Sequence, residues 1–554
     1  MGEQIERMAS LSQVSGLLGK QRAAHLLRRA TMGPRIQDIN AFASMTAPAA
    51  FTALVQNDPI PAFPKDPNTG TDWIYPNVPD PTQINDIWSD LTKCWWLSNV
   101  KQSGPNLTER MLWFYHTHIP VIMTRISWNP QLAVDYLRLL RHYALGNYKD
   151  LVKAICIDNA MLIHLDGNLN IKSVPQENFG REFLELFTVG KGPEVALGDY
   201  TNFTEQDVKA LTKVFTGWQF DTTFQTVDAI TGIPTGKVKS DINGNATQHD
   251  VLPKLFSAAF NNQSIQTQNV VNWSCPILAV KTELSDAVDM VFSSVNTAKH
   301  IVRRVYRQFV YFDITPTIET DIIEPLATTL MANNYDLLSV LEILLQSEHF
   351  YDLDSPPTSD NSIGAIIKSP LDLTLGAIRF FELNGPNPTS NLTQHYTLYG
   401  QLLQQLSLQG LELFEPVDVA GYDPYFQVPS FHRYWISANY LANRYKFAEL
   451  LINGFSSGGS TLLKLEVLPF VEAKATQVSD PTILVQDLVE WLIPISIDQA
   501  RFDYFKDEIL LNNGAINWSS EWASYQATSN NTVVKAQLEL LVKSIMQSPE
   551  YQLF

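Results

Sequence analysis

Residues 21–31 read QRAAHLLRRAT, and this short stretch shows the period that decides the fold. Ala24, Leu27 and Ala30 recur at three-residue spacing, which places them on one face of an α-helix. The dipeptide Gly33-Pro34 follows, with a glycine suited to a helix C-terminus and a proline that cannot continue the helix. The stretch therefore predicts an amphipathic helix with a defined end.

The same helical period recurs along most of the chain. It predicts further helices over residues 84–100, 107–116, 131–145, 149–157, 205–215, 284–309, 318–333, 335–347, 371–383, 431–452, 485–492 and 532–546. Around residues 218–275 the pattern changes, because Thr, Val and Ile alternate with polar residues and Gly-Asn turns appear. The sequence thus predicts a mainly α, large multi-helix globular protein with a small β-hairpin-containing insertion around 218–275.

A second irregular stretch, residues 384–393 (NGPNPTSNLT), separates a larger helical region, 1–383, from a smaller C-terminal region, 384–554. These regions either form two domains or pack as one continuous unit.

Composition limits the classes of function. The formal net charge of −18 argues against nucleic-acid binding, which requires clustered Lys and Arg. No apolar run is long enough for a transmembrane helix, and no signal peptide is recognised at the start of this chain. The three cysteines lie far apart and form no metal-binding or disulfide pattern.

Residues 175–192, PQENFGREFLELFTVGKG, gather acidic and amide side chains on one side of a predicted helix. Ser173 is expected to cap this helix, which should run over about 174–188. Asn178, Glu182 and Glu185 then stand at i, i+4 and i+7 on one face. Such a face is either solvated or balanced by a cation, an arginine or an imidazole.

Several motifs resemble those of one bacterial family. They are residues 24–33 (AHLLRRATMG), 109–118 (ERMLWFYHTH), 139–147, 159–168, 176–187, 200–208, 216–218, 249–250, 368–370 and 414–421. The family is catalogued as domain of unknown function number 1800. The resemblance implies a mostly helical protein, commonly exported to the periplasm or cell surface, and often encoded beside a sulfatase- or phosphatase-like protein that is a candidate partner.

The first functional hypothesis is a divalent-metal site in a hydrolase-like enzyme. His116 and His118 are expected at the end of a helix, where an extended turn would aim both imidazoles at one point. Together with the dipeptide His249-Asp250 they would hold Zn, Mn or Fe. Glu182, Glu185 and Asp166 are the candidate catalytic carboxylates: they would supply further oxygen ligands, and a glutamate would act as base on a metal-activated water.

The alternative is a non-catalytic scaffold, assembly or binding protein, in which the same polar residues form a structural network. Its expected members are His25, Arg28, Arg29, Glu177, Asn178, Arg181 and Asp207. Bidentate pairing of the three arginines with Glu182, Glu185 and Asp207 would join the first helix to the Glu-rich one. Glu177 and Arg181 are spaced for a separate ion pair.

Aromatic residues offer a further clue. Trp95 and Trp113 lie within helical patterns and are predicted to pack in the core, although aromatic platforms also bind sugars. In the loop GYDPYFQVPSFHRYW, Tyr422, Tyr425 and Phe426 are predicted at a pocket rim, because loops on rigid scaffolds carry binding residues.

Overall fold

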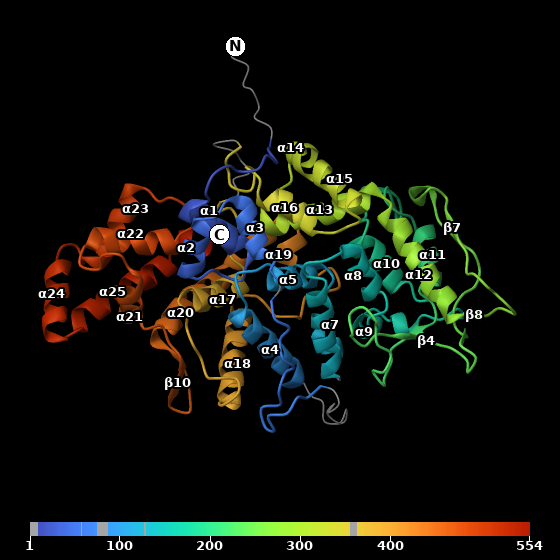
Figure 1. Ribbon diagram of the computed structural model, residues 1–554, viewed down its shortest axis with the longest axis horizontal. Helices are drawn as coiled ribbons and strands as arrows, with labels where there is room; N and C mark the ends of the chain where they lie inside the picture. The colour runs from blue at the N-terminus through green and yellow to red at the C-terminus, as the bar shows by residue number, and fades with distance from the viewer. Residues whose placement is uncertain (1–8, 57, 75–86, 127–128, 355–362) are drawn as a thin grey trace, which may run out of the picture.

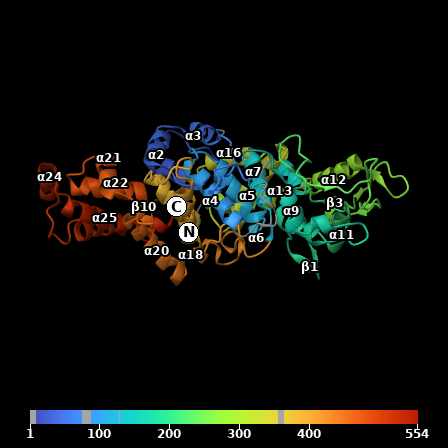
Figure 2. The same ribbon diagram turned by 90° about the horizontal axis from the view of Figure 1, so that it is seen from below.

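A computed structural model of the chain describes residues 9–56, 58–74, 87–126, 129–354 and 363–554. The protein is mainly α-helical, with short antiparallel strand pairs, as the sequence predicted. Its body is elongated in both views (Figures 1 and 2). Helices α21–α25 form one end, the hairpins of residues 218–276 with α11 and α12 form the other, and α1, α5, α13 and α17 lie between them.

The N-terminal part is built from helices. They are α1 (Gly19–Ala30), α2 (Ile36–Ala43), α3 (Ala47–Leu54), α4 (Ile87–Gln102), α5 (Thr108–His118), α6 (Met123–Ile126), α7 (Pro130–His142), α8 (Tyr148–Ile155), α9 (Asn159–His164), η2 (Gly167–Leu169), α10 (Asn178–Glu182), η3 (Phe183–Phe187) and α11 (Glu205–Val214). The middle part continues with η4 (Ala258–Phe260), α12 (Ile277–Phe292), α13 (Val295–Phe309), α14 (Pro316–Ile318), η5 (Glu319–Ile323), α15 (Glu324–Ala332), α16 (Leu338–Leu345), α17 (Pro370–Phe380) and α18 (Leu392–Leu408).

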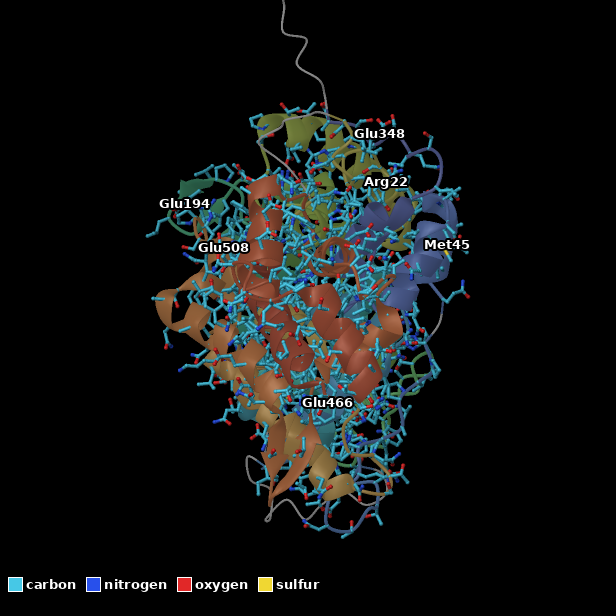
Figure 3. The ribbon with its side chains drawn as sticks, turned by 90° about the vertical axis from the view of Figure 1, so that its left-hand side faces the viewer. Arg22, Met45, Glu194, Glu348, Glu466 and Glu508 are labelled. Atoms are coloured by element: carbon cyan, nitrogen blue, oxygen red, sulfur yellow. The ribbon has the colours of Figure 1, made fainter. Side chains whose placement is uncertain are left out.

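The C-terminal part contains α19 (Asp423–Phe426), η6 (Phe431–Ile436), α20 (Ala438–Asn453), α21 (Val467–Lys474), α22 (Pro481–Leu492), α23 (Gln499–Asp503), η7 (Tyr504–Leu510), α24 (Trp518–Thr528), α25 (Thr532–Met546) and η8 (Glu550–Gln552). Figure 3 looks onto this end of the body, where exposed acidic side chains such as Glu466 and Glu508 carry part of the negative charge. The predicted boundary near residue 384 stays a prediction; α17 and α18, on either side of it, contact each other.

Two predicted helices are interrupted. The helix expected over 284–309 is divided into α12 and α13, because the Ser294 hydroxyl accepts the Asn296 N–H at 3.3 Å and caps a new helix. The helix expected over 431–452 is the 3₁₀ helix η6 followed by α20, which the Ser437 hydroxyl caps. The first residues of the helix predicted over 84–100 lie outside the described part of the chain, and α4 is described from Ile87.

The predicted hairpin insertion is confirmed. Within it β3 (Trp218–Gln219) pairs with β4 (Lys237–Val238), β5 (Asn245–Ala246) with β8 (Cys275–Pro276), and β6 (Lys254–Leu255) with β7 (Ser264–Ile265), all antiparallel. Two hairpins that the sequence did not predict lie elsewhere: β1 (Glu194–Ala196) with β2 (Asp199–Tyr200), and β9 (Phe455–Ser457) with β10 (Ser460–Leu463).

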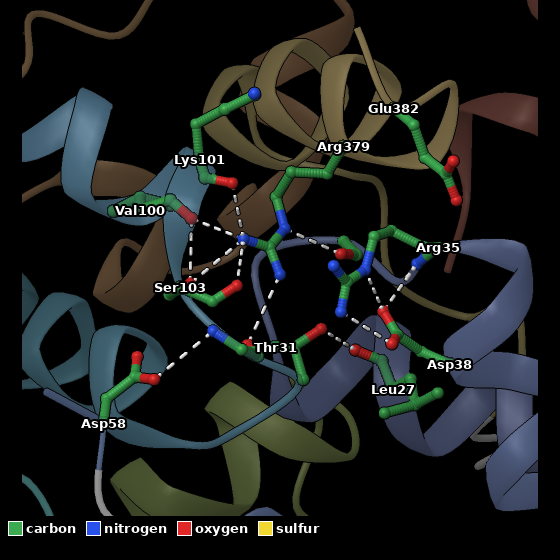
Figure 4. Close-up of polar contacts among 12 residues, drawn as sticks. Leu27, Thr31, Arg35, Asp38, Asp58, Val100, Lys101, Ser103, Arg379 and Glu382 are labelled. Atoms are coloured by element: carbon green, nitrogen blue, oxygen red, sulfur yellow. Dashed lines mark hydrogen bonds and ion pairs between the residues drawn. The ribbon is translucent and has the colours of Figure 1, made fainter. Parts of the chain in front are cut away.

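Helices α1, α4 and α17 meet in a close polar junction (Figure 4). A Cβ at Gly33, where φ is +108°, would lie only 2.5 Å from the Cα of Gly376, so this approach requires glycine. The Arg379 guanidinium donates to the carbonyls of Gly33 at 2.9 Å, Val100 at 2.5 Å and Ser103 at 3.0 Å. One side chain of α17 thus fixes the ends of two other helices.

Helix α5 runs through the centre of the core, and all of its residues are buried. Trp113 is fully buried there, which confirms its predicted core position. The three cysteines are buried and free. None of the described helices is long and apolar enough to cross a membrane.

Candidate functional site

His116 and His118 both lie inside α5, whereas the sequence analysis placed them on an extended turn. Residues two apart in an α-helix are rotated by about 200°, so their side chains leave opposite faces. The His116 ring packs against Phe414, with centroids 4.6 Å apart, and His118 packs against Phe114 at 4.4 Å. The helix therefore keeps the two imidazoles from converging on one point.

His249 and Asp250 lie in the hairpin insertion, in a different polar cluster. His249 is fully buried, and its Nε2 lies 3.2 Å from Glu283 Oε2, while Lys254 Nζ lies 2.5 Å from Glu283 Oε1. Asp250 closes a turn by accepting the Leu252 N–H at 2.8 Å. This cluster joins the hairpins to α12 and includes neither His116 nor His118.

The expected metal ligands are thus dispersed. Asp166 is exposed in the left-handed turn between α9 and η2, with φ of 58°. Within the described ranges, no group of three or more His, Cys, Asp or Glu side chains is arranged to hold a metal ion.

The Glu-rich helix begins later and ends differently from the prediction. It starts at Asn178, because Ile171 and Val174 form an antiparallel bridge that places Ser173 in a turn instead of at the helix cap. After Glu182 the helix widens into the π-helical turn η3. Turns of this kind occur frequently at functional sites.

The acidic face of this helix is only partly buried. Glu177 and Asn178 are exposed, whereas Glu182 and Glu185 are half-buried. Glu185 forms an ion pair with Lys191. Burial and the neighbouring Glu185 carboxylate raise the pKa of Glu182 to about 7. The face is thus balanced in part by a lysine just beyond the helix.

The predicted arginine pairing is wrong in its partners. Arg181 binds both oxygens of Glu205, at 2.6 and 3.0 Å, and reaches Glu177 at 3.5 Å. Asp207 is the N3 residue of α11 and accepts the Ser257 N–H at 2.7 Å, so it fixes a helix end. Arg181 and Asp207 therefore act in separate local contacts.

Arg28 and Arg29 bind helix ends instead of glutamates. Arg28 donates to the carbonyl of Trp491 at 2.7 Å, in the last turn of α22. Arg29 donates to the carbonyl of Val310 at 3.1 Å, at the C-cap of α13. Carbonyls in these positions lack helical partners and form the negative end of the helix dipole, which attracts the positively charged guanidinium groups.

His25 lies beside these arginines in the core. Its Nε2 is 2.9 Å from the Phe350 carbonyl oxygen, and its ring packs on Phe350 at 4.6 Å. Burial and the charge of Arg29 lower the pKa of His25 well below its usual range. The ring is therefore neutral and serves packing.

A small pocket lies where α5, α13, α17 and η6 meet, and we call it the His432 pocket. Its volume is about 50 Å³, room for roughly four waters at 10–15 Å³ each. Its polar wall consists of Thr117, His118, Arg304, Arg307, Gln308, Ser369, Asp372, Tyr425 and His432. Tyr425 thus lines a pocket, as predicted, whereas Tyr422 is buried against Trp113 with rings 5.3 Å apart.

His432 lines this pocket, and its hydrogen bonding defines which ring nitrogen carries the proton. The Ile367 N–H donates to His432 Nδ1 at 3.1 Å, so the proton of the neutral ring must be on Nε2. Burial, with the charges of Arg29 and Arg433, lowers the pKa of His432 to about 4 and keeps the ring neutral. His432 is 8% exposed, and among the described residues its buried Nε2 has no hydrogen-bond partner.

Two arginines of α13 add positive charge. Arg304 Nε donates to His300 Nε2 at 3.0 Å, and Arg307 Nε donates to the Phe312 carbonyl at 3.2 Å. Burial lowers the pKa of Arg304 to about 10 and also lowers that of Arg307. Holding both charges in this wall therefore costs free energy, which an anion would offset.

The one carboxylate in the described wall is already occupied. Asp372 Oδ1 lies 2.6 Å from Arg110 Nη2, and Asp372 Oδ2 accepts the Ser369 hydroxyl at 2.7 Å. Arg110 is 1% exposed, so this is a buried ion pair. Among the described residues the wall therefore offers Arg304 and Arg307 no second carboxylate, although Asp313 and Glu319 lie near Arg307 outside the wall.

A second hollow shares Asp372 and Phe554 with the His432 pocket and is also cationic. It has a volume of about 40 Å³ and is lined by Arg28 and Lys368. Lys368 Nζ donates to the Tyr551 carbonyl at 2.6 Å. Burial, with the charge of Arg28, lowers the pKa of Lys368 well below its usual range.

Comparison with known families supports the resemblance seen in the sequence. The model of a family described as protein of unknown function (DUF1800) matches residues 25–553. The chain belongs to the DUF1800 family. No curated protein and no solved structure matches this DUF1800 chain significantly.

Sequence reasoning missed most residues of the pocket in this DUF1800 protein. The motifs quoted for the resemblance include Arg110, Lys368 and Ser369, but no local spacing assigned them a role. No function was predicted for Arg304 or His432. The role of a single polar residue on a helix depends on neighbours that are distant in sequence, so local patterns do not reveal it. The tetrapeptide Phe431-His-Arg-Tyr434 in an aromatic loop was the available signal for His432.

Proposed function

We propose that this DUF1800 protein binds a small anion, or the anionic group of a larger ligand, in the His432 pocket. The observation that carries the proposal is the Nε2–H of His432, which has no partner among the described residues, in a wall that also contains Arg304 and Arg307. A carboxylate, phosphate or sulfate oxygen accepts hydrogen bonds from such donors and supplies the missing negative charge.

The contrast between surface and interior supports this proposal. The chain has a formal net charge of −18, yet the pocket wall holds Arg304 and Arg307, and the hollow behind it is lined by Arg28 and Lys368. Buried cations require compensation, and Asp372 provides one carboxylate for this group. An entering anion would therefore gain more here than at the acidic surface.

This proposal is compatible with both functions considered from the sequence, an enzyme and a non-catalytic binding protein, with an anionic ligand in each case. His118 also lines the pocket, and burial with the charge of Arg304 lowers its pKa well below the usual range. The His118 ring is therefore neutral and can form a hydrogen bond to a bound ligand, but its lowered basicity does not favour proton transfer. The metal-assisted route is not retained, because its expected ligands occupy separate environments.

Calorimetric titration of the full chain with phosphate, sulfate and acetate, in low-salt buffer, tests the proposal. We expect at least one anion to bind and to raise the melting temperature. Arg304→Gln should weaken that binding about tenfold or more, since it removes a charged donor. His432→Phe should weaken it as well, because the ring shape remains while the Nε2–H is lost.

Arg303→Gln is the matched control, because Arg303 is the neighbouring residue of α13 but pairs with Glu319 at 2.5 Å and does not line the pocket. It should leave the affinity unchanged. Absence of binding by all three anions, or equal weakening by Arg303→Gln and Arg304→Gln, would overturn the proposal.

A scaffold function is the second candidate, supported by the way buried cations hold distant segments together. Arg28 binds the Trp491 carbonyl at 2.7 Å, and Arg444 Nε binds Gln552 Oε1 at 2.8 Å. On this proposal the assembly partner is the sulfatase- or phosphatase-like protein that the family resemblance implied. Co-purification of the two proteins from cells that express both, with no anion binding, would favour the scaffold.

A further inference from the structure

A second site lies on the other side of α5, away from the His432 pocket. Two hollows of about 430 and 390 Å³ adjoin there, and their walls share Asp58, Ile60, Pro61, Trp95, Asn99, Glu109 and Arg141. We call the combined hollow the Trp95 cleft. Each part has the size of an ordinary small-molecule site, about 300–1,000 Å³.

The charged groups of the cleft neutralise one another. Arg141 Nε donates to Glu109 Oε1 at 2.9 Å, and Arg141 Nη2 lies 3.8 Å from Asp58 Oδ2. Asp58 Oδ1 in turn accepts the Gly104 N–H at 3.3 Å, close to the Arg379 junction (Figure 4). Arg138, also in the wall, pairs with Asp135 at 2.8 Å. Among the described residues, the cleft therefore has no surplus charge to attract an ion.

Unused polar atoms remain in the same wall. Thr108 is 4% exposed, and its buried hydroxyl has no hydrogen-bond partner among the described residues. The buried Asn99 Nδ2 likewise lacks one within that part of the chain. Within the described residues Arg141 uses Nε and Nη2 in its contacts with Glu109, Pro59 and Asp58, which leaves Nη1 as a further donor. A buried polar group without a partner is costly, so these atoms require a ligand or water.

An aromatic face completes the site. The Trp95 indole N–H donates to the Ala62 carbonyl at 2.9 Å, which fixes the ring, and the residue is half-buried instead of packed in the core as predicted. Trp96 lies behind it, and its N–H donates to Glu109 Oε2 at 2.9 Å. Both oxygens of Glu109 are thus occupied, so Glu109 is a positioning residue for Arg141.

We propose that the Trp95 cleft binds a neutral saccharide chain, with a sugar ring stacked on Trp95 and hydroxyl groups bonded to Asn99, Thr108 and Arg141. The C–H groups of a pyranose ring carry partial positive charge and meet the negative face of an indole. Hydroxyl groups both donate and accept, which suits a wall that offers an amide, a hydroxyl and one guanidinium nitrogen without partners among the described residues. Two adjoining hollows suit a chain better than a single ring.

Titration of the full chain with cellotetraose, chitotetraose and maltotetraose, followed by tryptophan fluorescence and calorimetry, tests this proposal. We expect at least one of them to bind and to change the fluorescence. Trp95→Ala should weaken the binding about tenfold or more. Thr108→Val, which keeps the side-chain shape and removes the hydroxyl, should weaken it by a smaller factor.

Trp273→Ala is the matched control, since Trp273 is 71% exposed in the hairpin insertion and does not line the cleft. Its melting temperature and that of Trp95→Ala should show that both variants fold. Failure of all three saccharides to bind would refute the proposal, as would binding that Trp95→Ala leaves unchanged. Preference for tetragalacturonate over the neutral chains would also refute it. Arg304→Gln should leave saccharide binding intact, so this test is independent of anion binding in the His432 pocket.

Discussion

Replacing Lys254 by methionine should strongly destabilise the hairpin insertion. The Lys254 and Glu283 side chains are 0% and 1% exposed and form a 2.5 Å ion pair, so the variant leaves a buried carboxylate without its cation. Breaking such a pair by removing one partner costs about 3–5 kcal/mol. Burial alone raises the pKa of Glu283, but the bonds and charges of His249 and Lys254 outweigh burial and hold it below the usual range.

The double variant Lys254→Met/Glu283→Met should cost much less than the sum of the single variants, because two apolar side chains replace both charges. Hydrogen exchange of amides in α12 and β6 would measure the local opening free energy. Lys281→Met is the control, since Lys281 is exposed on α12 and should change stability by about 0.5 kcal/mol or less. A loss below about 1 kcal/mol in Lys254→Met, or additive costs in the double variant, would refute this reasoning.

Three further predictions follow from other parts of the structure. Because the pKa of Glu182 is raised to about 7, the folded protein binds this proton more tightly than the unfolded chain, and stability should fall as pH rises through that value. Glu182→Gln should therefore stabilise the protein at pH above 7 and have little effect below the ordinary carboxyl pKa; a pH-independent change in thermal melting would count against it. Gly33→Ala should lower the free energy of unfolding by about 3 kcal/mol, because its Cβ would lie 2.5 Å from Gly376 Cα at a φ of +108°. Gly376→Ala should have a mild effect, because its Cβ would meet nothing closer than 4.0 Å. Equal losses of stability in denaturant unfolding would contradict this prediction. Treatment with EDTA should leave the melting temperature unchanged, because His116, His118 and His249 do not share a site, and a drop that zinc restores would contradict that geometry.

Local patterns in the sequence predicted much of the helical architecture. The period at residues 21–31 gave α1 within two residues, and that at 532–546 gave α25. Side-chain capping explains the errors, because Ser294 starts a new helix inside an unbroken apolar period. Ser173 does not cap the helix, because an antiparallel bridge between Ile171 and Val174 places it in a turn. A rule based on capping residues alone does not take such a bridge into account.

The candidate site was harder to predict because its contacts are long-range. Arg110 and Asp372 form an ion pair across 262 residues, and nothing near either residue indicates the other. The arginines were expected to pair with the Glu-rich helix. Arg28 and Arg29 instead donate to carbonyls at helix ends, which the sequence-based expectation did not consider. The sequence shows His116 and His118 two residues apart, but the directions of their side chains depend on whether the helix continues through both residues. It does, so the two rings point away from each other.

The bond from Arg28 to Trp491 spans 463 residues and has a consequence for synthesis on the ribosome. At about 5–20 residues per second, roughly 25–90 s pass between the emergence of the two partners. During that interval the arginine of the first helix must remain hydrated or be shielded by a chaperone. Closing a loop of this length costs conformational entropy before the contact at its end forms. Folding of the nascent polypeptide should therefore be slow and should depend on the final stretch of translation.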